Sequence, residues 1–211
     1  LLSAAQPLTA QEADWRFSEA PFTDLWAHGL AVVGFHGFGP MPLYDPGYAG
    51  SVTADRAERS MLEQRRGELL GAFMSDEAFE VLHFVPLYFF DAPRELALDA
   101  LAAVADTPEG LPDIEDPTVR DGAHAVASVL SGPWHRQVLG RFVSALRAES
   151  PTIDALRASV AEERTQQIRA LSTTWATRYA PPLSEFLAHE GFGAGLALLT
   201  PAIGAEGRFM Q

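Results

Sequence analysis

The hydrophobic and polar positions of this chain follow the 3.6-residue period of α-helices over most of its length. The longest such run covers about 151–180, and its apolar residues lie mostly three, four or seven positions apart. These residues are Ile153, Leu156, Val160, Ile168, Leu171, Trp175 and Tyr179. Ser150 is suited to cap a helix, Pro151 to its first turn, and Pro181-Pro182 to its end. The pattern predicts one long helix with a buried apolar side, so an aspartate in place of Leu171 is expected to unfold the protein.

The same spacing predicts shorter helices elsewhere in the chain. They are expected at 21–33, 53–74, 76–84, 94–106, 119–130, 134–149 and 183–191. A strand is the alternative for Leu30–Phe35, because a Val-Val pair and flanking glycines favour it. The aromatic run Val85–Phe90 fits a buried helix or a buried strand equally well. Because the connection from 134–149 into the long helix is so short, the two helices are expected to pack as an antiparallel pair.

Glycine and proline interrupt the helical pattern in three places. Residues 36–50 are dense in both and predict an ordered loop. Residues 106–118 hold three prolines and five acidic residues, which predicts an exposed loop and the place for any domain boundary. Near the C-terminus, 196–211 has the pattern of a strand, a turn and the first residues of a return strand. The open edge of such a β-hairpin calls for more sequence or for a partner.

Together these elements predict a mainly α-helical fold organised on the long helix at about 151–180, with a short β-hairpin near the C-terminus. With 211 residues, 47% of them hydrophobic, the chain is long enough to bury a full core. We therefore expect a single helical domain over 15–211. Residues 1–14 include small residues such as Ser3 and Ala5 after an apolar start, which fits a signal-peptide remnant and equally a disordered tail.

Charge and composition exclude several classes of function. The chain carries 28 acidic and 15 basic residues, and its net charge of −13 argues against nucleic acid and anionic lipid as partners, because both attract clustered positive charge. All 15 basic residues are arginine, and the chain has no lysine, asparagine or cysteine, a bias that we interpret as that of a GC-rich bacterial genome. Without cysteine there is no disulfide, thiolate metal ligand or cysteine nucleophile. No apolar stretch is long enough for a transmembrane helix.

No motif in the sequence specifies a catalytic, cofactor or metal site. The six histidines are His28, His36, His83, His124, His135 and His189. None has a metal-ligand spacing such as HExxH. Gly34, Gly37 and Gly39 are spaced as in a phosphate-binding turn, but prolines follow where a helix N-terminus would be needed. Two acidic groups have the pattern of solvated faces. They are Asp113, Glu115 and Asp116, and Glu162 with Glu163. We therefore predict no catalytic, cofactor-binding or metal-binding residue, and no cofactor.

An aromatic cluster is the strongest candidate for a contact surface. It comprises Phe84, Tyr88, Phe89 and Phe90, together with Trp26 and Trp134. Aromatic residues in such number are most simply part of a core. Any exposed part of the cluster becomes the best candidate for binding a protein, because large exposed apolar patches mark interaction sites.

Four stretches of the chain carry a resemblance to a known class of proteins. They are the long helix, AFEVLHFVPLYF at 78–89, LGRFVSALRAE at 139–149 and LTPAIGAEGRF at 199–209. With them the chain resembles the N-terminal portion of uncharacterised secreted bacterial proteins with a zincin-peptidase-like plan. In zincin-like proteins a long backing helix is followed by strands and then by the HExxH helix that binds zinc. The resemblance implies a scaffold, and no catalytic residue of such a family has a counterpart in this sequence.

Three functional hypotheses follow. The first is a non-catalytic extracytoplasmic protein, periplasmic or secreted, that acts as an accessory subunit or scaffold and binds a protein partner in a larger assembly, including a membrane-associated one. The second is the N-terminal half of a zincin-like hydrolase whose metal site lies beyond Gln211. The third is a carrier with a small-molecule pocket between the helices and the aromatic cluster. The lack of a catalytic motif favours the first.

Overall fold

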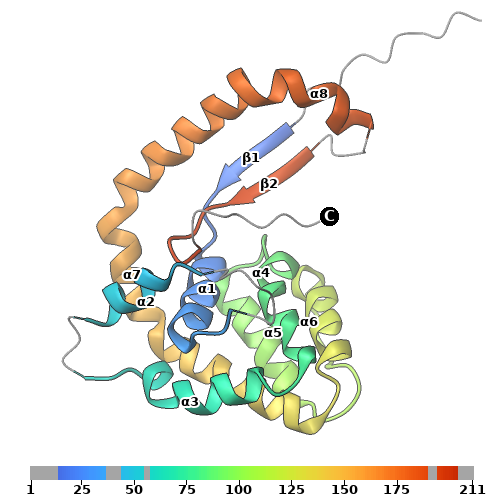
Figure 1. The fold of residues 1–211 in the computed structure, drawn as a ribbon. Helices are drawn as coiled ribbons and strands as arrows, with labels where there is room; N and C mark the ends of the chain where they lie inside the picture. The colour runs from blue at the N-terminus through green and yellow to red at the C-terminus, as the bar shows by residue number, and fades with distance from the viewer. Residues whose placement is uncertain (1–13, 37–43, 55–57, 190–193, 204–211) are drawn as a thin grey trace, which may run out of the picture. The chain divides into compact units, whose positions relative to one another are not determined.

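A computed structural model describes residues 14–36, 44–54, 58–189 and 194–203 (Figure 1). The predicted mainly α-helical fold is confirmed, and the longest helix is α7 (Pro133–Thr174). None of the helices in these ranges is long and apolar enough to cross a membrane. The chain divides into two compact units, of which unit 1 comprises residues 1–19 and 159–199 and unit 2 comprises residues 20–158 and 200–211. The span 15–211, expected as a single domain, thus falls into two such units.

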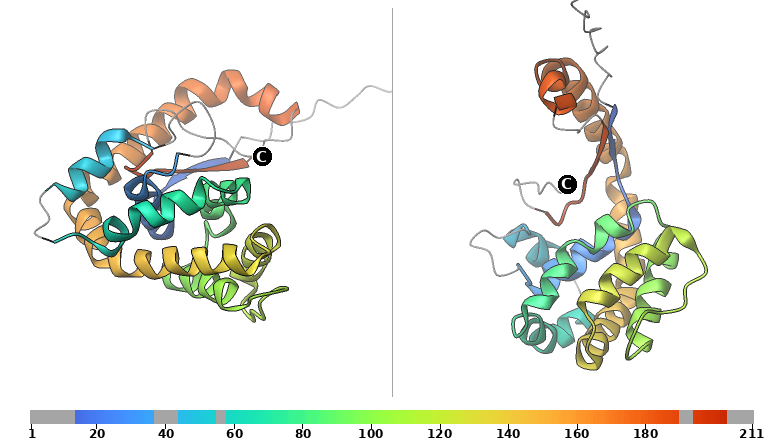
Figure 2. Two further views of the ribbon diagram at one scale, coloured as in Figure 1. Left: turned by 60° about the horizontal axis from the view of Figure 1, so that its bottom comes forward. Right: turned by 90° about the vertical axis from the view of Figure 1, so that its right-hand side faces the viewer.

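Helix α1 (Pro21–Val33) lies among the other helices of unit 2, and all its residues from Phe22 onward are buried (Figure 2). It contacts α2 (Pro46–Thr53), α3 (Met61–Phe73), α4 (Val85–Tyr88) and α5 (Arg94–Asp106). Pro21 starts the helix where no N–H is needed, and Gly34 ends it with a φ of 82°, a conformation that favours glycine. The helix predicted at 21–33 is confirmed, and the strand alternative for 30–35 is wrong.

The hydrophobic core formed by the described residues belongs to unit 2. Within it Trp26 of α1 packs edge-on against Phe142 of α7, and its indole N–H donates to the carbonyl of Leu82 at 2.7 Å. Gly29 lets α1 approach α7 closely, since a Cβ at this position would lie 2.3 Å from Leu146 Cδ2. The core of unit 2 therefore depends on close packing between α1 and the first half of α7.

The region between α1 and α3 differs from the prediction. Residues 46–53, expected to lie mostly in an irregular loop, form α2, whose cap Asp45 accepts a hydrogen bond from the N–H of Gly47 at 2.8 Å. The helix expected to start at Thr53 starts instead at Met61. Ser60 and Glu63 form a capping box there, which satisfies two backbone N–H groups at once and fixes the start of α3. Residues 37–43 and 55–57 lie outside the described residues.

The next elements follow the predicted order. A 3₁₀ helix, η1 (Glu77–His83), is capped by Asp76 rather than by the expected Ser75, and α4 follows it directly. The helix expected at 94–106 is α5, and the one expected at 119–130 is α6 (Pro117–Val129). Residues 107–116, within the predicted loop 106–118, form no regular structure. Both ends of this loop belong to unit 2, so the division between the units falls elsewhere.

The long helix extends further toward the N-terminus than predicted. α7 runs from Pro133 to Thr174 without a break, so 134–149 and the following segment form one helix and not an antiparallel pair. Pro151, expected to start a helix, lies inside it. A proline inside a helix removes one backbone hydrogen bond. The neighbouring side chains of Glu149 and Ile153 are both buried, and this packing holds the helix together across the proline.

The two prolines after Ala180 also fail to end the helix. A π-helical turn, η2 (Trp175–Tyr179), follows α7, and α8 (Ala180–His189) continues through Pro181 and Pro182. The N–H of Ala180 donates to the carbonyl of Trp175, five residues back. Since a proline ring clashes with the carbonyl four residues back in a regular helix, the wider turn accommodates the pair without a break. The part of the predicted helix 183–191 that the structure describes, 183–189, is therefore the end of α8.

Unit 1 contains a two-stranded sheet in its described residues (Figure 1). β1 (Asp14–Ser18) pairs in parallel with β2 (Ala194–Leu198), which places Trp15 opposite Gly195. A strand near the C-terminus is as predicted, and its partner among the described residues is the N-terminal segment. The expected return strand falls in 204–211, outside the described residues. Only a long connection such as the one through α7 and α8 can join parallel strands.

Arg164 connects the helix to the sheet within unit 1. Its side chain is buried and forms an ion pair with Glu19, with 3.4 Å between Nη1 and Oε2. It also donates to the carbonyl of Leu199 at 2.8 Å. Because Glu19 follows β1 and Leu199 follows β2, one guanidinium group holds the ends of both strands against α7.

Candidate functional site

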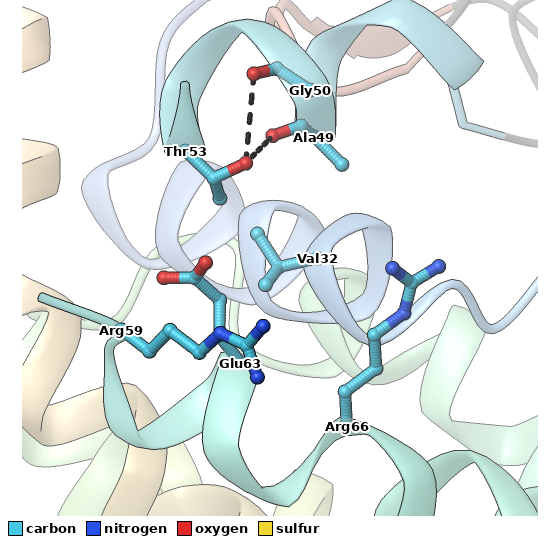
Figure 3. A pocket seen from close by; sticks show the side chains of 7 residues that line it. All are labelled: Val32, Ala49, Gly50, Thr53, Arg59, Glu63 and Arg66. Atoms are coloured by element: carbon cyan, nitrogen blue, oxygen red, sulfur yellow. Dashed lines mark hydrogen bonds between the residues drawn. The ribbon is translucent and has the colours of Figure 1, made fainter. Parts of the chain in front are cut away.

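A hollow of about 320 Å³ opens between α1, α2 and α3 of unit 2 (Figure 3). It is lined by Val32, Ala49, Gly50, Thr53, Arg59, Glu63 and Arg66. Glu63 and Arg66 belong to α3 and Arg59 comes just before it, the α2 residues lie opposite, and the buried Val32 of α1 forms an apolar wall. Thr53 donates its hydroxyl hydrogen to the carbonyl of Ala49 at 2.8 Å. The volume is at the lower end of the range typical of small-molecule sites, about 300–1,000 Å³.

The hollow has more positive than negative charge. Arg66 Nε donates to the carbonyl of Val33 at 3.3 Å, at the C-terminal end of α1 where the helix dipole favours a cation. Glu63 is engaged in the capping box, where its carboxylate accepts a hydrogen bond from the N–H of Ser60 at 2.9 Å. The guanidinium group of Arg59 forms no ion pair with any residue that the structure describes. Two cations and one carboxylate thus line a space with one apolar wall.

The charge of Arg66 also acts on a histidine close by. The pKa of His36 is lowered from its ordinary value, mainly because the ring is partly buried and further because the positive charge of Arg66 disfavours protonation. In the sequence Arg66 falls in the helix predicted at 53–74 and His36 in the loop predicted at 36–50, and no pattern indicates that the two are neighbours. Only the fold of α1 against α3 brings them together.

The clearest apolar surface of unit 1 lies on its helices. Four large apolar side chains are exposed there. They are Leu171, Tyr179, Leu183 and Phe186. Their spacing of eight, four and three residues places them near one side of the helix, the side that also carries Trp175. The ring of Trp175 lies 5.1 Å from that of Trp15 and 6.3 Å from that of Phe17, both in β1. The exposed residues thus extend an apolar face that the sheet covers only in part.

The prediction that the apolar side of the long helix is buried throughout is wrong at Leu171, which is 42% exposed. In the described part of unit 1 no apolar side chain is fully buried. The narrow sheet covers little of this face, because opposite Trp15 and Phe17 strand β2 has only the small residues Gly195 and Ala197. The indole N–H of Trp175 is buried and has no hydrogen-bond acceptor among the described residues.

Some residues of the predicted aromatic cluster lie in the core and others are exposed at the surface. Trp26 and Phe89 are buried, and Phe84 is partly buried. The exposed members are Tyr88, Phe90 and Trp134. Tyr88 and Phe90 belong to one short exposed segment that also includes Leu87. This segment is an apolar surface of unit 2, and the other aromatic residues serve packing.

Four of the six histidines have hydrogen-bond partners within the fold. His28 is the most buried, with Nδ1 3.1 Å from the hydroxyl of Tyr48 and Nε2 3.4 Å from Oε2 of Glu149. Others pair in the same way. His83 lies against Tyr44, His124 against the carbonyl of Pro112, and His135 against Asp76. Over the residues that the structure describes, no group of three or more His, Cys, Asp or Glu side chains could hold a metal ion.

The glycine and acidic motifs have local roles where the structure describes them. Gly34 ends α1, while Gly37 and Gly39 lie outside the described residues. Asp116 caps α6, and its pKa is lowered because its carboxylate accepts hydrogen bonds from the hydroxyl and the N–H of Thr118. The remaining members are simple to place. Asp113 and Glu115 are exposed, and Glu162 and Glu163 accept hydrogen bonds from Gln166 and Gln167 one turn later.

Comparison with models of protein families, with curated proteins and with solved structures gives no match for this chain. The class that the structure defines is a mainly α-helical protein with a small parallel sheet.

Proposed function

We propose that this chain is a non-catalytic structural or interaction protein, an accessory subunit or scaffold that binds a protein partner through unit 1. The observation that carries this proposal is the exposed apolar helix face formed by Leu171, Tyr179, Leu183 and Phe186. Large apolar side chains gathered on one surface are typical of sites where proteins meet. A partner that covers this face would bury them.

The sheet of unit 1 supports the same proposal. β1 and β2 have five residues each, and two-stranded sheets are at best marginally stable in water. Parallel strands are typical of sheets that are covered on both faces. β2 contains only alanine, glycine and leucine, so it has no charged residue that would keep a further strand from pairing with it. A partner strand beside β2 would complete the sheet.

An extracytoplasmic location, periplasmic or secreted, is part of the proposal. It is supported by the sequence of residues 1–14, in which Ser3 and Ala5 are spaced as in a signal-peptide cleavage site. N-terminal sequencing of the protein isolated from its host tests this, because cleavage after Ala5 would leave Gln6 as the first residue. The zincin-like resemblance stays a prediction that no described residue supports.

Size-exclusion chromatography with light scattering, together with binding of the dye ANS, tests the contact surface. We expect the purified chain to bind the dye or to self-associate as its concentration rises. Leu183→Ser and Phe186→Ser should each reduce both effects. Leu111→Ser is the matched control, since Leu111 is as exposed as Phe186 (55% and 58%) but lies in unit 2. A monodisperse monomer that binds no dye would contradict the proposal. An equal loss of dye binding and self-association in the control would contradict it as well.

A further inference from the structure

The hollow between α1, α2 and α3 has the form of a small ligand site. Val32 and Ala49 give it apolar surface, and Gly50 adds no side chain, since even a Cβ at this position would meet no atom within 4 Å. The side chains of Arg59, just before α3, and of Arg66 in α3 lie on the opposite side (Figure 3). The hollow therefore combines an apolar wall with two cationic side chains.

The arginines of the hollow form no ion pair with a carboxylate of the described residues. Five arginines among the described residues form ion pairs with carboxylates. They are Arg94, Arg141, Arg147, Arg157 and Arg164. Arg59 has no such partner among the described residues, and Arg66 donates its Nε hydrogen to a backbone carbonyl, which leaves its two Nη groups available. Two guanidinium groups thus line one hollow, and neither forms an ion pair with a carboxylate of the described residues.

We propose that this hollow binds a small organic anion, whose carboxylate or phosphate oxygens are held by Arg59 and Arg66 and whose apolar part lies against Val32 and Ala49. The planar guanidinium group matches both kinds of oxyanion through paired hydrogen bonds. The carboxylate of Glu63, which accepts a hydrogen bond from the N–H of Ser60, offsets one of the two positive charges, so the lining keeps a net positive charge. The site is independent of the protein contact proposed for unit 1.

Isothermal titration calorimetry at constant ionic strength tests the site with three probes of similar shape. Benzoate and phenyl phosphate carry the two oxyanions, and benzamide is the neutral counterpart. We expect saturable binding of at least one anion and none of benzamide. Arg59→Gln and Arg66→Gln should each weaken binding by about tenfold or more, as expected for the loss of a charge-assisted hydrogen bond. Whichever anion binds more tightly identifies the oxyanion.

Arg65→Gln is the matched control, since Arg65 is next to Arg66 on α3 and carries the same charge but does not line the hollow. Arg65→Gln should change the affinity for the anion by less than about twofold, because salt screens the long-range attraction between a surface charge and the anion. Arg59→Gln removes no contact that the structure describes, so its result stands even if Arg66→Gln lowers stability. The proposal is overturned by the absence of saturable binding of either anion, or by binding that all three variants weaken equally.

Discussion

Nη2 of Arg136 in α7 donates to the backbone carbonyl of Gly110 at 2.6 Å. The same guanidinium group donates to the carbonyls of Ala127 and Leu130, each at 3.0 Å, and to that of Thr107. The side chain is buried, and desolvation lowers its pKa below the ordinary value for arginine. One arginine thus joins the end of α5, the acidic loop and the end of α6 to the start of α7.

Replacing Arg136 with lysine should destabilise unit 2. A single ammonium group cannot reach carbonyls on three segments, and each buried carbonyl left without a donor costs about 1–3 kcal/mol. We expect the free energy of unfolding to fall by about 3 kcal/mol in urea denaturation followed by circular dichroism. Arg120→Lys is the control, because Arg120 binds two carbonyls of the same loop at a more exposed position. Equal losses for the two variants would contradict the role given to Arg136.

Two glycines in helices of unit 2 should respond to alanine in opposite directions. Gly29→Ala would place a Cβ 2.3 Å from Leu146 Cδ2 and 3.0 Å from Cζ of Phe142, so α1 and α7 must separate. Such overpacking costs about 1–3 kcal/mol. Gly67→Ala in α3 meets no atom within 4 Å, and alanine in an exposed helix interior gains about 0.5–1 kcal/mol over glycine. Thermal unfolding of the two variants should show shifts of opposite sign.

Leu171→Asp should leave the protein folded. Leu171 is 42% exposed, so the aspartate stays in contact with water and the loss of stability should be below about 1 kcal/mol. Leu146→Asp is the matched substitution at a fully buried position of the same helix, and it should unfold unit 2 because it buries an unpaired charge. Circular dichroism spectra of the two variants decide this, and an unfolded Leu171→Asp would show that its surroundings are more buried than the structure has them.

Elements with local start and stop signals could be predicted from the sequence. The bounds of α1 were predicted correctly, because Pro21, the helical apolar pattern and Gly34 are all local signals. The errors arose where local signals compete with packing. Pro151 would end an isolated helix, but the core contacts of its neighbours outweigh one lost hydrogen bond. The turn η2 could not be predicted either, because a π-turn has no sequence signal of its own.

Pairings between distant segments could not be predicted at all. β1 and β2 lie about 180 positions apart, so neither turn residues nor loop length indicates that they pair. The hollow was missed for the same reason, because the sequence shows Arg59 and Arg66 only as charges near a helix. Their neighbours Val32 and Ala49 come from other elements, and α2 itself was not expected.

Arg66→Gln should raise the pKa of His36. The positive charge of Arg66 is the second cause of the lowered pKa, whereas burial of the ring, the main cause, remains in the variant. The pKa should therefore rise but stay below its ordinary value, which NMR titration of the imidazole can measure. Because the folded state binds the proton more weakly than the unfolded state, stability is lost as the pH falls below about 6.5. This loss should be smaller in Arg66→Gln, and an unchanged pKa would show that the charge of Arg66 does not reach the ring.

Asp76 should make a separate contribution to acid sensitivity. Its pKa is lowered first by the hydrogen bond from the N–H of Ala78 and then by that from His135, whose Nε2 lies 3.0 Å from Oδ2. A carboxyl group with a lowered pKa stabilises the fold above about pH 4, and this contribution is lost as the pH falls through its folded-state pKa. In Asp76→Asn the free energy of unfolding should fall near neutral pH, and the gap to the wild type should close toward pH 2. His135→Ala should raise the pKa of Asp76 only in part, since the N–H of Ala78 still donates. A gap that is the same at pH 2 and pH 7 would show that Asp76 acts through its shape and not through its charge.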